Sequence, residues 1–216
     1  KSRTLSCGFA RTATAPSSRA RVAVGDLGLQ RPASVVIRNA RTDVAVTVAE
    51  LQAAHDRAVE NSAATLIHRA AVPFPGFEDA DATAVLPDFI VVAPKIAPET
   101  GSWLVAGDAK DYERVRSRID DQRMLKGYLQ VALGAESFDV WSKRPAGMNV
   151  HSHGVLAVPR NAFLQPLAVV EDLTDHREEV RMRVAQRHAE AAGVAIADEQ
   201  PVDDFVAHLM ATYDPA

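Results

Sequence analysis

The sequence has one cysteine, no long apolar run and no excess of positive charge, and each shortage narrows what the protein can be. The lone Cys7 excludes an internal disulfide and a cluster of thiolate metal ligands. No apolar stretch approaches the ~20 residues needed to cross a bilayer, which predicts a cytoplasmic protein that uses no membrane. The formal net charge of −4 shows that the molecule is not a polycation, so nucleic-acid binding would depend on a local basic patch.

The composition is nevertheless that of a protein with a substantial core. Its 216 residues, 47% of them hydrophobic, suit one α/β domain with elaborations. We expect an N-terminal β-rich elaboration over residues 1–46, an α/β core over 47–170 and helices packed on this core over 171–216. A capping box at Thr47–Glu50 predicts a helix that runs to about Ser62. Further expected elements are strands at 22–24, 34–37, 65–72 and 155–158, and helices at 175–193 and 201–210.

Two apolar runs that carry acids form the most informative stretch of the chain. Residues 84–93 and 103–110 both have the composition of strands, and the loop between them contains two prolines and a glycine. Because residues two apart in a strand face the same side, Asp108 and Lys110 share one face. If the two strands pair as a hairpin, Asp88 lies beside Asp108. The sequence therefore predicts two carboxylates and a lysine at one place on a sheet.

Such a group of side chains has a recognisable chemistry. Two carboxylates and a backbone carbonyl, here that of Ala109, suit a hard cation such as Mg²⁺, which keeps several waters and also takes phosphate oxygens. A bound cation of this kind lowers the pKa of water and neutralises charge that develops on a phosphate. A lysine beside it can orient the attacking water or stabilise the pentavalent phosphorus.

At these residues the chain resembles the PD-(D/E)XK nuclease superfamily. Pro87-Asp88 matches the PD half of the motif, and Asp108-Ala109-Lys110 matches the (D/E)XK half. The resemblance implies a restriction-endonuclease-like α/β core, in which a central mixed β-sheet is flanked by helices. It also implies a Mg²⁺- or Mn²⁺-dependent nuclease, with Asp88, Asp108 and the Ala109 carbonyl as metal ligands and Lys110 as the catalytic lysine.

The segment after the lysine extends the resemblance to the RecB-like branch of that superfamily. Residues 119–135 have a helical pattern, and in that branch a Gln-x-x-x-Tyr helix follows the lysine and lines the cleft. Gln130 stands in the place of the glutamine, with Gln122 as a second candidate. Gly134 stands where the branch has tyrosine, and Tyr128, one turn earlier, is the candidate to replace it.

Several other residues are candidate site residues, although each also has a more ordinary structural interpretation. The branch can take a further metal ligand from a preceding helix or strand, which makes Glu60 and His68 candidates, although a solvated glutamate and a structural histidine are the commoner cases. His151 and His153 could share a strand face and bind Zn²⁺ or Mn²⁺, but no third ligand is near in sequence, which favours a structural role. The basic residues that follow the motif are candidate phosphate contacts or a solvated face: Arg114, Arg116, Arg118 and Lys126.

Two hypotheses of function follow. The first is a metal-dependent nuclease that hydrolyses DNA phosphodiester bonds through Asp88, Asp108 and Lys110, with Gln130 orienting the site. The second is an inactive module of the same fold that binds nucleic acid or a protein partner in a defence or repair assembly. The sequence leaves open a homodimer, protein partners in a larger system, the strand preference and whether cutting is endo- or exonucleolytic.

Overall fold

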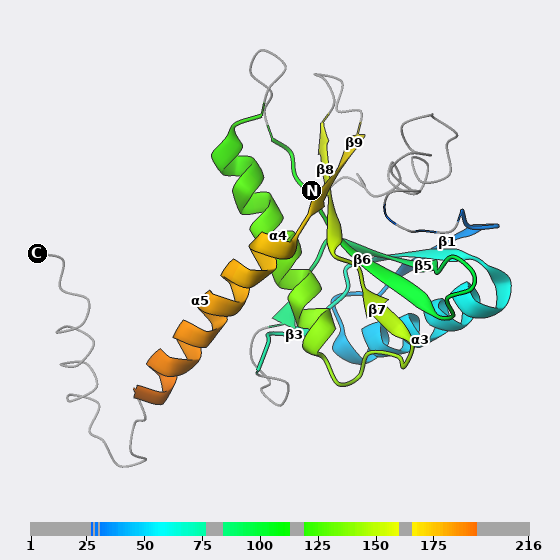
Figure 1. The fold of residues 1–216 in the computed structure, drawn as a ribbon, viewed down its shortest axis with the longest axis horizontal. Helices are drawn as coiled ribbons and strands as arrows, with labels where there is room; N and C mark the ends of the chain where they lie inside the picture. Colours follow the sequence, from blue (N-terminus) through cyan, green and yellow to red (C-terminus); the bar gives the residue numbers. More distant parts are fainter. Residues whose placement is uncertain are drawn as a thin grey trace, which may run out of the picture. The chain divides into compact units, whose positions relative to one another are not determined.

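The computed structural model describes residues 27, 29, 31–76, 84–112, 119–159 and 166–193. Along the chain, these form the elements β1 (Val35–Asn39), α3 (Val44–Asn61), β2 (Ala64–His68), β3 (Val72–Pro73), β4 (Ala84–Val85), β5 (Phe89–Pro94), β6 (Ser102–Ala109), α4 (Asp121–Val140), β7 (Met148–Val150), β8 (His153–Pro159), β9 (Pro166–Asp172) and α5 (Thr174–Gly193) (Figure 1). The expected strand at 22–24 and the expected helix at 201–210 lie outside the described residues. None of the helices described is long and apolar enough to span a membrane.

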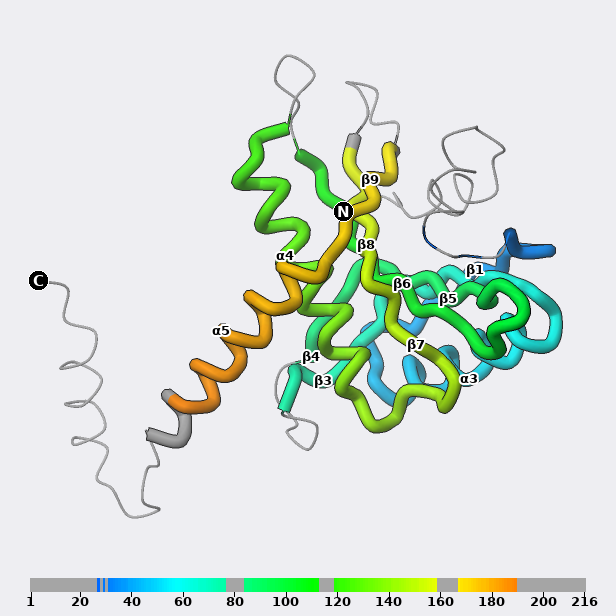
Figure 2. The backbone as a smooth tube through the Cα atoms, viewed as in Figure 1, coloured from blue at the N-terminus to red at the C-terminus, as the bar shows by residue number. Residues whose placement is uncertain are grey.

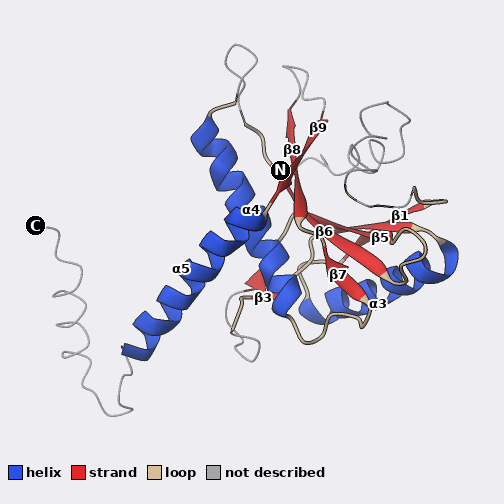
Figure 3. Ribbon diagram, viewed as in Figure 1, coloured by secondary structure: helices blue, strands red, loops and turns tan. Residues whose placement is uncertain are grey.

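A mixed seven-stranded sheet forms the centre of the fold, as expected for an α/β protein. Its order is β1-β2-β5-β6-β8-β9, and β7 pairs with the first half of β6 (Figure 3). Strand β5 pairs antiparallel with both β2 and β6, whereas β6 and β8 run parallel and β8 and β9 antiparallel. The expected strand at 34–37 is β1, which pairs parallel with β2 and so belongs to the main sheet itself.

The described helices α3 and α4 pack on one face of this sheet. On α3 the buried side chains recur at helical spacing, as at Leu51, Ala54 and Ala58, and they meet Ile67 and Ile90 of the sheet. Helix α4 packs on β6 and β8, as the tube view shows (Figure 2). The other face carries a separate apolar cluster of side chains from the same strands: Leu66, Phe89, Val91, Val105, Val155 and Ala157.

The residue that caps helix α3, Asp43, lies four residues before Thr47, the cap that the sequence predicted. The Asp43 carboxylate accepts the backbone N–H of Val46 at 2.9 Å and so caps the helix. Thr47 is fully buried inside the helix, where its hydroxyl donates to the Asp43 carbonyl at 2.7 Å and accepts the Ala71 N–H at 2.9 Å. The predicted capping role of Thr47 and Glu50 is therefore wrong, because an aspartate one turn earlier caps the helix. The predicted end at Ser62 is confirmed.

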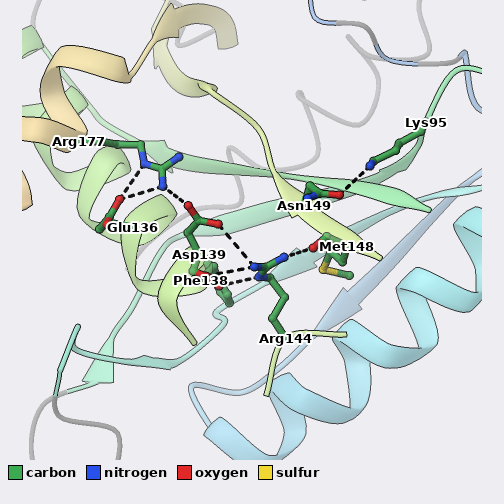
Figure 4. A network of polar contacts seen from close by, with 8 residues as sticks. All are labelled: Lys95, Glu136, Phe138, Asp139, Arg144, Met148, Asn149 and Arg177. Atoms are coloured by element: carbon green, nitrogen blue, oxygen red, sulfur yellow. Dashed lines mark hydrogen bonds and ion pairs between the residues drawn. The ribbon is translucent and has the colours of Figure 1, made fainter. Parts of the chain in front are cut away.

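A network of ion pairs fixes the C-terminal part of α4, the helix that covers the candidate site. Arg177 donates from Nε to Glu136 Oε2 at 2.9 Å and from Nη2 to Asp139 (Figure 4). Arg144 reaches the same end of α4, where its Nε donates to the Phe138 carbonyl at 3.0 Å. Both Arg177 and Glu136 are buried, so each charge depends on the other for its stabilisation.

The chain divides into two compact units, residues 1–180 and 181–216. Helix α5 begins in the first unit, where the Asp172 carboxylate accepts the N–H of Thr174 at 2.9 Å and its hydroxyl at 2.6 Å. The helix expected at 175–193 is thus present and begins at Thr174.

A glycine near the end of β6, Gly107, permits close packing against the Phe89 ring of β5. A Cβ at Gly107 would lie 2.2 Å from Cε2 of the fully buried Phe89 ring. We therefore expect Gly107→Ala to lower the free energy of unfolding by about 3 kcal/mol, measured by urea denaturation, since a packed core cannot absorb the added methyl. Adding Phe89→Leu should restore part of this loss. Equal stability of Gly107→Ala and the parent protein would contradict the packing.

Candidate active site

The hairpin of β5 and β6 brings the two aspartates of the motif together. Phe89 is paired with Gly107, so Asp88, just before β5, lies beside Asp108 near the end of β6. One backbone group holds both acids: the Ala109 N–H donates to Asp88 Oδ2 at 2.9 Å and to Asp108 Oδ1 at 3.0 Å. The two carboxylates thus converge on the same peptide group.

Lys110 completes the group of charges. Its Nζ lies 2.6 Å from Asp108 Oδ2, with both side chains largely covered. Its backbone N–H donates to the Ala157 carbonyl of β8 at 2.9 Å, which anchors the end of β6. The three charged residues that the sequence placed on neighbouring strands are therefore brought to one place in the structure.

The electrostatics of this group favour a bound cation. The pKa of Asp108 is raised to about 7: burial is the largest cause, a hydrogen bond with Asp88 adds to it, and Lys110 opposes both. Asp108 Oδ2 is buried and accepts no regular hydrogen bond, so the 2.6 Å contact with Lys110 is an ion pair without hydrogen-bond geometry. A carboxylate oxygen that meets an ammonium without hydrogen-bond geometry keeps lone pairs that can take a cation.

Helix α4 covers this group with a face that carries two glycines. A Cβ at Gly127 would meet Leu156, the residue paired with Asp108 across β6 and β8, and a Cβ at Gly134 would lie 3.1 Å from Pro87 Cγ. Gln130 lies between these glycines in the helix, three residues after one and four before the other, so it shares their face. Its side chain is exposed. Gln130 therefore lies at the exposed margin of this face, and among the described residues it makes no contact with the two acids.

The tyrosine of the RecB-like helix has no counterpart on α4. Gly134 is in tight contact with Pro87, so a larger residue could not be accommodated there without moving the loop that carries Asp88. Tyr128 does not take its place, because it is buried with its ring 5.6 Å from that of His176 and its hydroxyl is influenced by Glu171. The expectation that Tyr128 substitutes for the tyrosine is therefore not supported by its position.

The other candidates do not join the group. His68 is paired with Phe89, which belongs to the cluster on the opposite face from the helices, so its ring lies on that face. Burial lowers its pKa, and Asp88 raises it by a smaller amount. Glu60, Gln122 and Lys126 are exposed helix residues, and within the described part of the chain none of them contacts the acids. Three expected phosphate contacts, Arg114, Arg116 and Arg118, lie outside the described residues.

The histidine pair after β7 has a structural role, as the sequence favoured. His151 is buried, and its Nδ1 accepts the His153 N–H at 3.0 Å while its Nε2 contacts the Leu27 carbonyl. Since Nδ1 accepts, Nε2 carries the proton and both ring nitrogens are used. The ring also packs edge-on against Trp103, with centroids 5.0 Å apart. Such a histidine has no lone pair left for a metal.

Sequence reasoning missed one residue at the site, Tyr112. Its hydroxyl would lie 3.3 Å from a Cβ at Gly127, so it lies over the glycine face of α4. Burial raises its pKa, and the charges of Lys110, Asp108 and Arg123 all act on it, which places the phenol among these groups. The available signal was its position two residues after the motif lysine. The sequence did not show the extended geometry that brings Tyr112 to the site.

The described part of the chain contains no group of three or more His, Cys, Asp or Glu side chains arranged to hold a metal ion. The two aspartates still suit Mg²⁺ or Mn²⁺, because such ions take one or two carboxylates from the protein and fill the remaining positions with water and phosphate oxygens. Comparison of the chain with protein-family models, with curated proteins and with solved structures found no match.

Proposed function

We propose that this protein is a Mg²⁺- or Mn²⁺-dependent nuclease that hydrolyses phosphodiester bonds of DNA. The observation that carries the proposal is the convergence of Asp88 and Asp108 on the Ala109 N–H, with Lys110 Nζ 2.6 Å from Asp108. Carboxylates, a lysine and a covering helix with an exposed glutamine are the set that the PD-(D/E)XK motif led us to expect.

The arrangement of elements supports a restriction-endonuclease-like core within this proposal. The two acids come from adjacent antiparallel strands, β5 and β6, and the helix that follows the lysine, α4, returns to the same face of the sheet as Asp88 and Asp108. Strand β8 then extends the sheet in parallel to β6. These features place the acids at the ends of two central strands, β5 and β6, on the face that α4 covers.

In the proposed reaction, Asp88 and Asp108 hold the ion, with the Ala109 carbonyl as a further ligand. When bound, the ion supplies positive charge to the phosphate and lowers the pKa of a water molecule. Lys110 donates a hydrogen bond to the attacking water or to a phosphate oxygen as negative charge develops there. The Ala109 N–H keeps the two carboxylates in register, and the exposed amide of Gln130 orients water or phosphate from the helix.

The direct test is incubation of the purified protein with single- and double-stranded DNA and RNA in Mg²⁺ or Mn²⁺. We expect DNA cleavage that EDTA stops and that Asp88→Asn removes. Cleavage of RNA in place of DNA would show that the substrate is RNA. Absence of cleavage of every substrate in both metals would refute the nuclease.

An inactive nucleic-acid- or protein-binding module is the second candidate, and two observations favour it. The net charge is −4, and the glycine at 134 replaces the tyrosine of the resembled helix. The two candidates differ in whether the metal site is intact.

Thermal melting distinguishes these candidates without a substrate. Since a ligand that binds only the native state stabilises it by about 2.7 kcal/mol at one hundred times its Kd, we expect saturating Mn²⁺ to raise the Tm by roughly 5 °C or more. Asp88→Asn should abolish the rise, whereas Asp56→Asn, an exposed acid on α3, should keep it. A Tm that is independent of Mn²⁺ in the parent protein would favour the inactive module.

A further inference from the structure

Tyr112 lies close enough to Asp108 and Lys110 to feel their charges, Arg123 acts on Tyr112 in the same way, and neither residue belongs to the PD-(D/E)XK motif. Tyr112 follows Lys110, the first residue after β6, by two residues, and Arg123 lies in the first turn of α4. Arg123 precedes Gly127 by four residues, so the two share a face of the helix. That face meets the Tyr112 hydroxyl at Gly127.

The packing at Gly127 leaves room for the Tyr112 phenol. A side chain at Gly127 would meet the Tyr112 hydroxyl at 3.3 Å and Leu156 at 2.9 Å, so only glycine leaves room for both. The backbone N–H of Lys110, bonded to the Ala157 carbonyl, fixes where the chain leaves the sheet toward Tyr112. The side chains of Asp108, Lys110 and Arg123 all exert their charges on the phenol.

The chemistry of the pair suits an anion. A phenol whose pKa is raised stays protonated at neutral pH and can donate a hydrogen bond. Arg123 has an exposed side chain with a permanent charge, and its guanidinium matches the geometry of a phosphate. Its backbone N–H is already used, since it donates to the Asp120 carboxylate at 3.0 Å, so only the side chain is available to a ligand.

We propose that Tyr112 and Arg123 form a phosphate-binding subsite that positions the DNA strand next to Asp88, Asp108 and Lys110. This inference rests on the proposed function for the identity of the substrate. The subsite holds a phosphate of the bound strand, with a hydrogen bond from the phenol and an ion pair from the guanidinium. Both are positioning residues, because they contact a phosphate that does not react.

The subsite is tested by binding of a fluorescein-labelled single-stranded oligodeoxynucleotide, followed by anisotropy, in the uncut state provided by Ca²⁺ in place of Mg²⁺. We expect Tyr112→Phe and Arg123→Gln each to weaken binding by roughly 5- to 10-fold, the loss of about one charge-assisted hydrogen bond. Arg31→Gln, which removes an exposed arginine before β1, should bind as the parent does.

The dependence on salt separates the two roles. Arg123→Gln should reduce the slope of log Kd against log salt concentration by about one, whereas Tyr112→Phe should leave the slope unchanged. In cleavage assays both variants should raise KM more than they lower kcat. Their melting temperatures should match that of the parent protein, which excludes a loss of fold as the cause.

The outcomes distinguish this inference from the proposed function. If the parent cuts DNA and both variants bind and cut as it does, the subsite is refuted and the nuclease stands. If the parent binds the oligonucleotide through these residues but cuts nothing, the subsite is supported and the nuclease is refuted. If the parent neither binds nor cuts, both are refuted.

Discussion

Replacing Lys110 by alanine should reduce DNA cleavage by about a thousand-fold or more while leaving DNA binding within a few-fold of the parent protein. The reason is the position of its ammonium, 2.6 Å from Asp108 and covered from solvent. A charge held in place near the reacting phosphate stabilises the transition state more than the ground state, so its loss lowers kcat and not affinity. Removal of one such preorganised group costs roughly 10²–10³ in rate, and a lysine that also orients water adds to this.

The measurement is single-turnover cleavage with a saturating enzyme, which isolates the chemical step. Lys110→Arg should recover little activity, because a planar guanidinium does not occupy the place of a compact ammonium. Lys143→Ala removes an exposed lysine in the loop before β7 and should cut at the rate of the parent protein. Cleavage by Lys110→Ala at more than about a tenth of the parental rate would show that the lysine is not catalytic.

The hairpin at the site could be predicted from sequence because its signals are local. Strand residues alternate with a period of two, and Pro94 and Gly101 mark the ends of the apolar runs, so the shared face of Asp108 and Lys110 follows directly. The Asp88–Asp108 proximity required only that two neighbouring strands pair in the simplest way. Helix α4 was likewise evident from its period, with its end at Val140 beyond the expected position.

Features that depend on distant contacts could not be predicted in this way. Nothing in the sequence around Val35–Asn39 shows that it pairs in parallel with β2, since parallel pairing brings together strands separated by a helix. The start of α3 was misplaced because Thr47–Glu50 has the correct spacing for a cap, and only the fold reveals that Thr47 is buried against Ala71. The face of His68 likewise follows from its register with β5.

The same distinction applies to the residues around the site. From the sequence, Gly134 was interpreted as the site of a missing tyrosine. Its contact with Pro87 shows that the small glycine lets α4 approach the loop that carries Asp88. Gly127 does the same for Tyr112. Close approaches between a helix and a loop leave no periodic signal in a sequence, so the second layer of the site becomes visible only in three dimensions.

Replacing Asp108 by asparagine should stabilise the metal-free protein at pH 8 but not at pH 4. Burial raises the pKa of Asp108 to about 7, from 3.8 for an unperturbed aspartate. The folded state therefore binds the proton more tightly than the unfolded state between about pH 4 and pH 7. Stability must then fall as the pH rises through this window, and the penalty is complete above pH 7. At about 1.4 kcal/mol for each unit of pKa, the penalty is on the order of 4 kcal/mol.

Asparagine has no proton to lose, so the stability of the Asp108→Asn variant should not show this fall with rising pH. The measurement is urea denaturation in EDTA from pH 4 to pH 8, and the expected signal is a difference between variant and parent that grows with pH by a few kcal/mol. Asp56→Asn, an exposed change on α3, should preserve the parental profile. Adding Mn²⁺ at pH 8 should make the parent protein more stable than Asp108→Asn, because only the carboxylate form of Asp108 gains a cation. Parallel profiles for Asp108→Asn and the parent protein would show that this carboxyl is not strained by its surroundings.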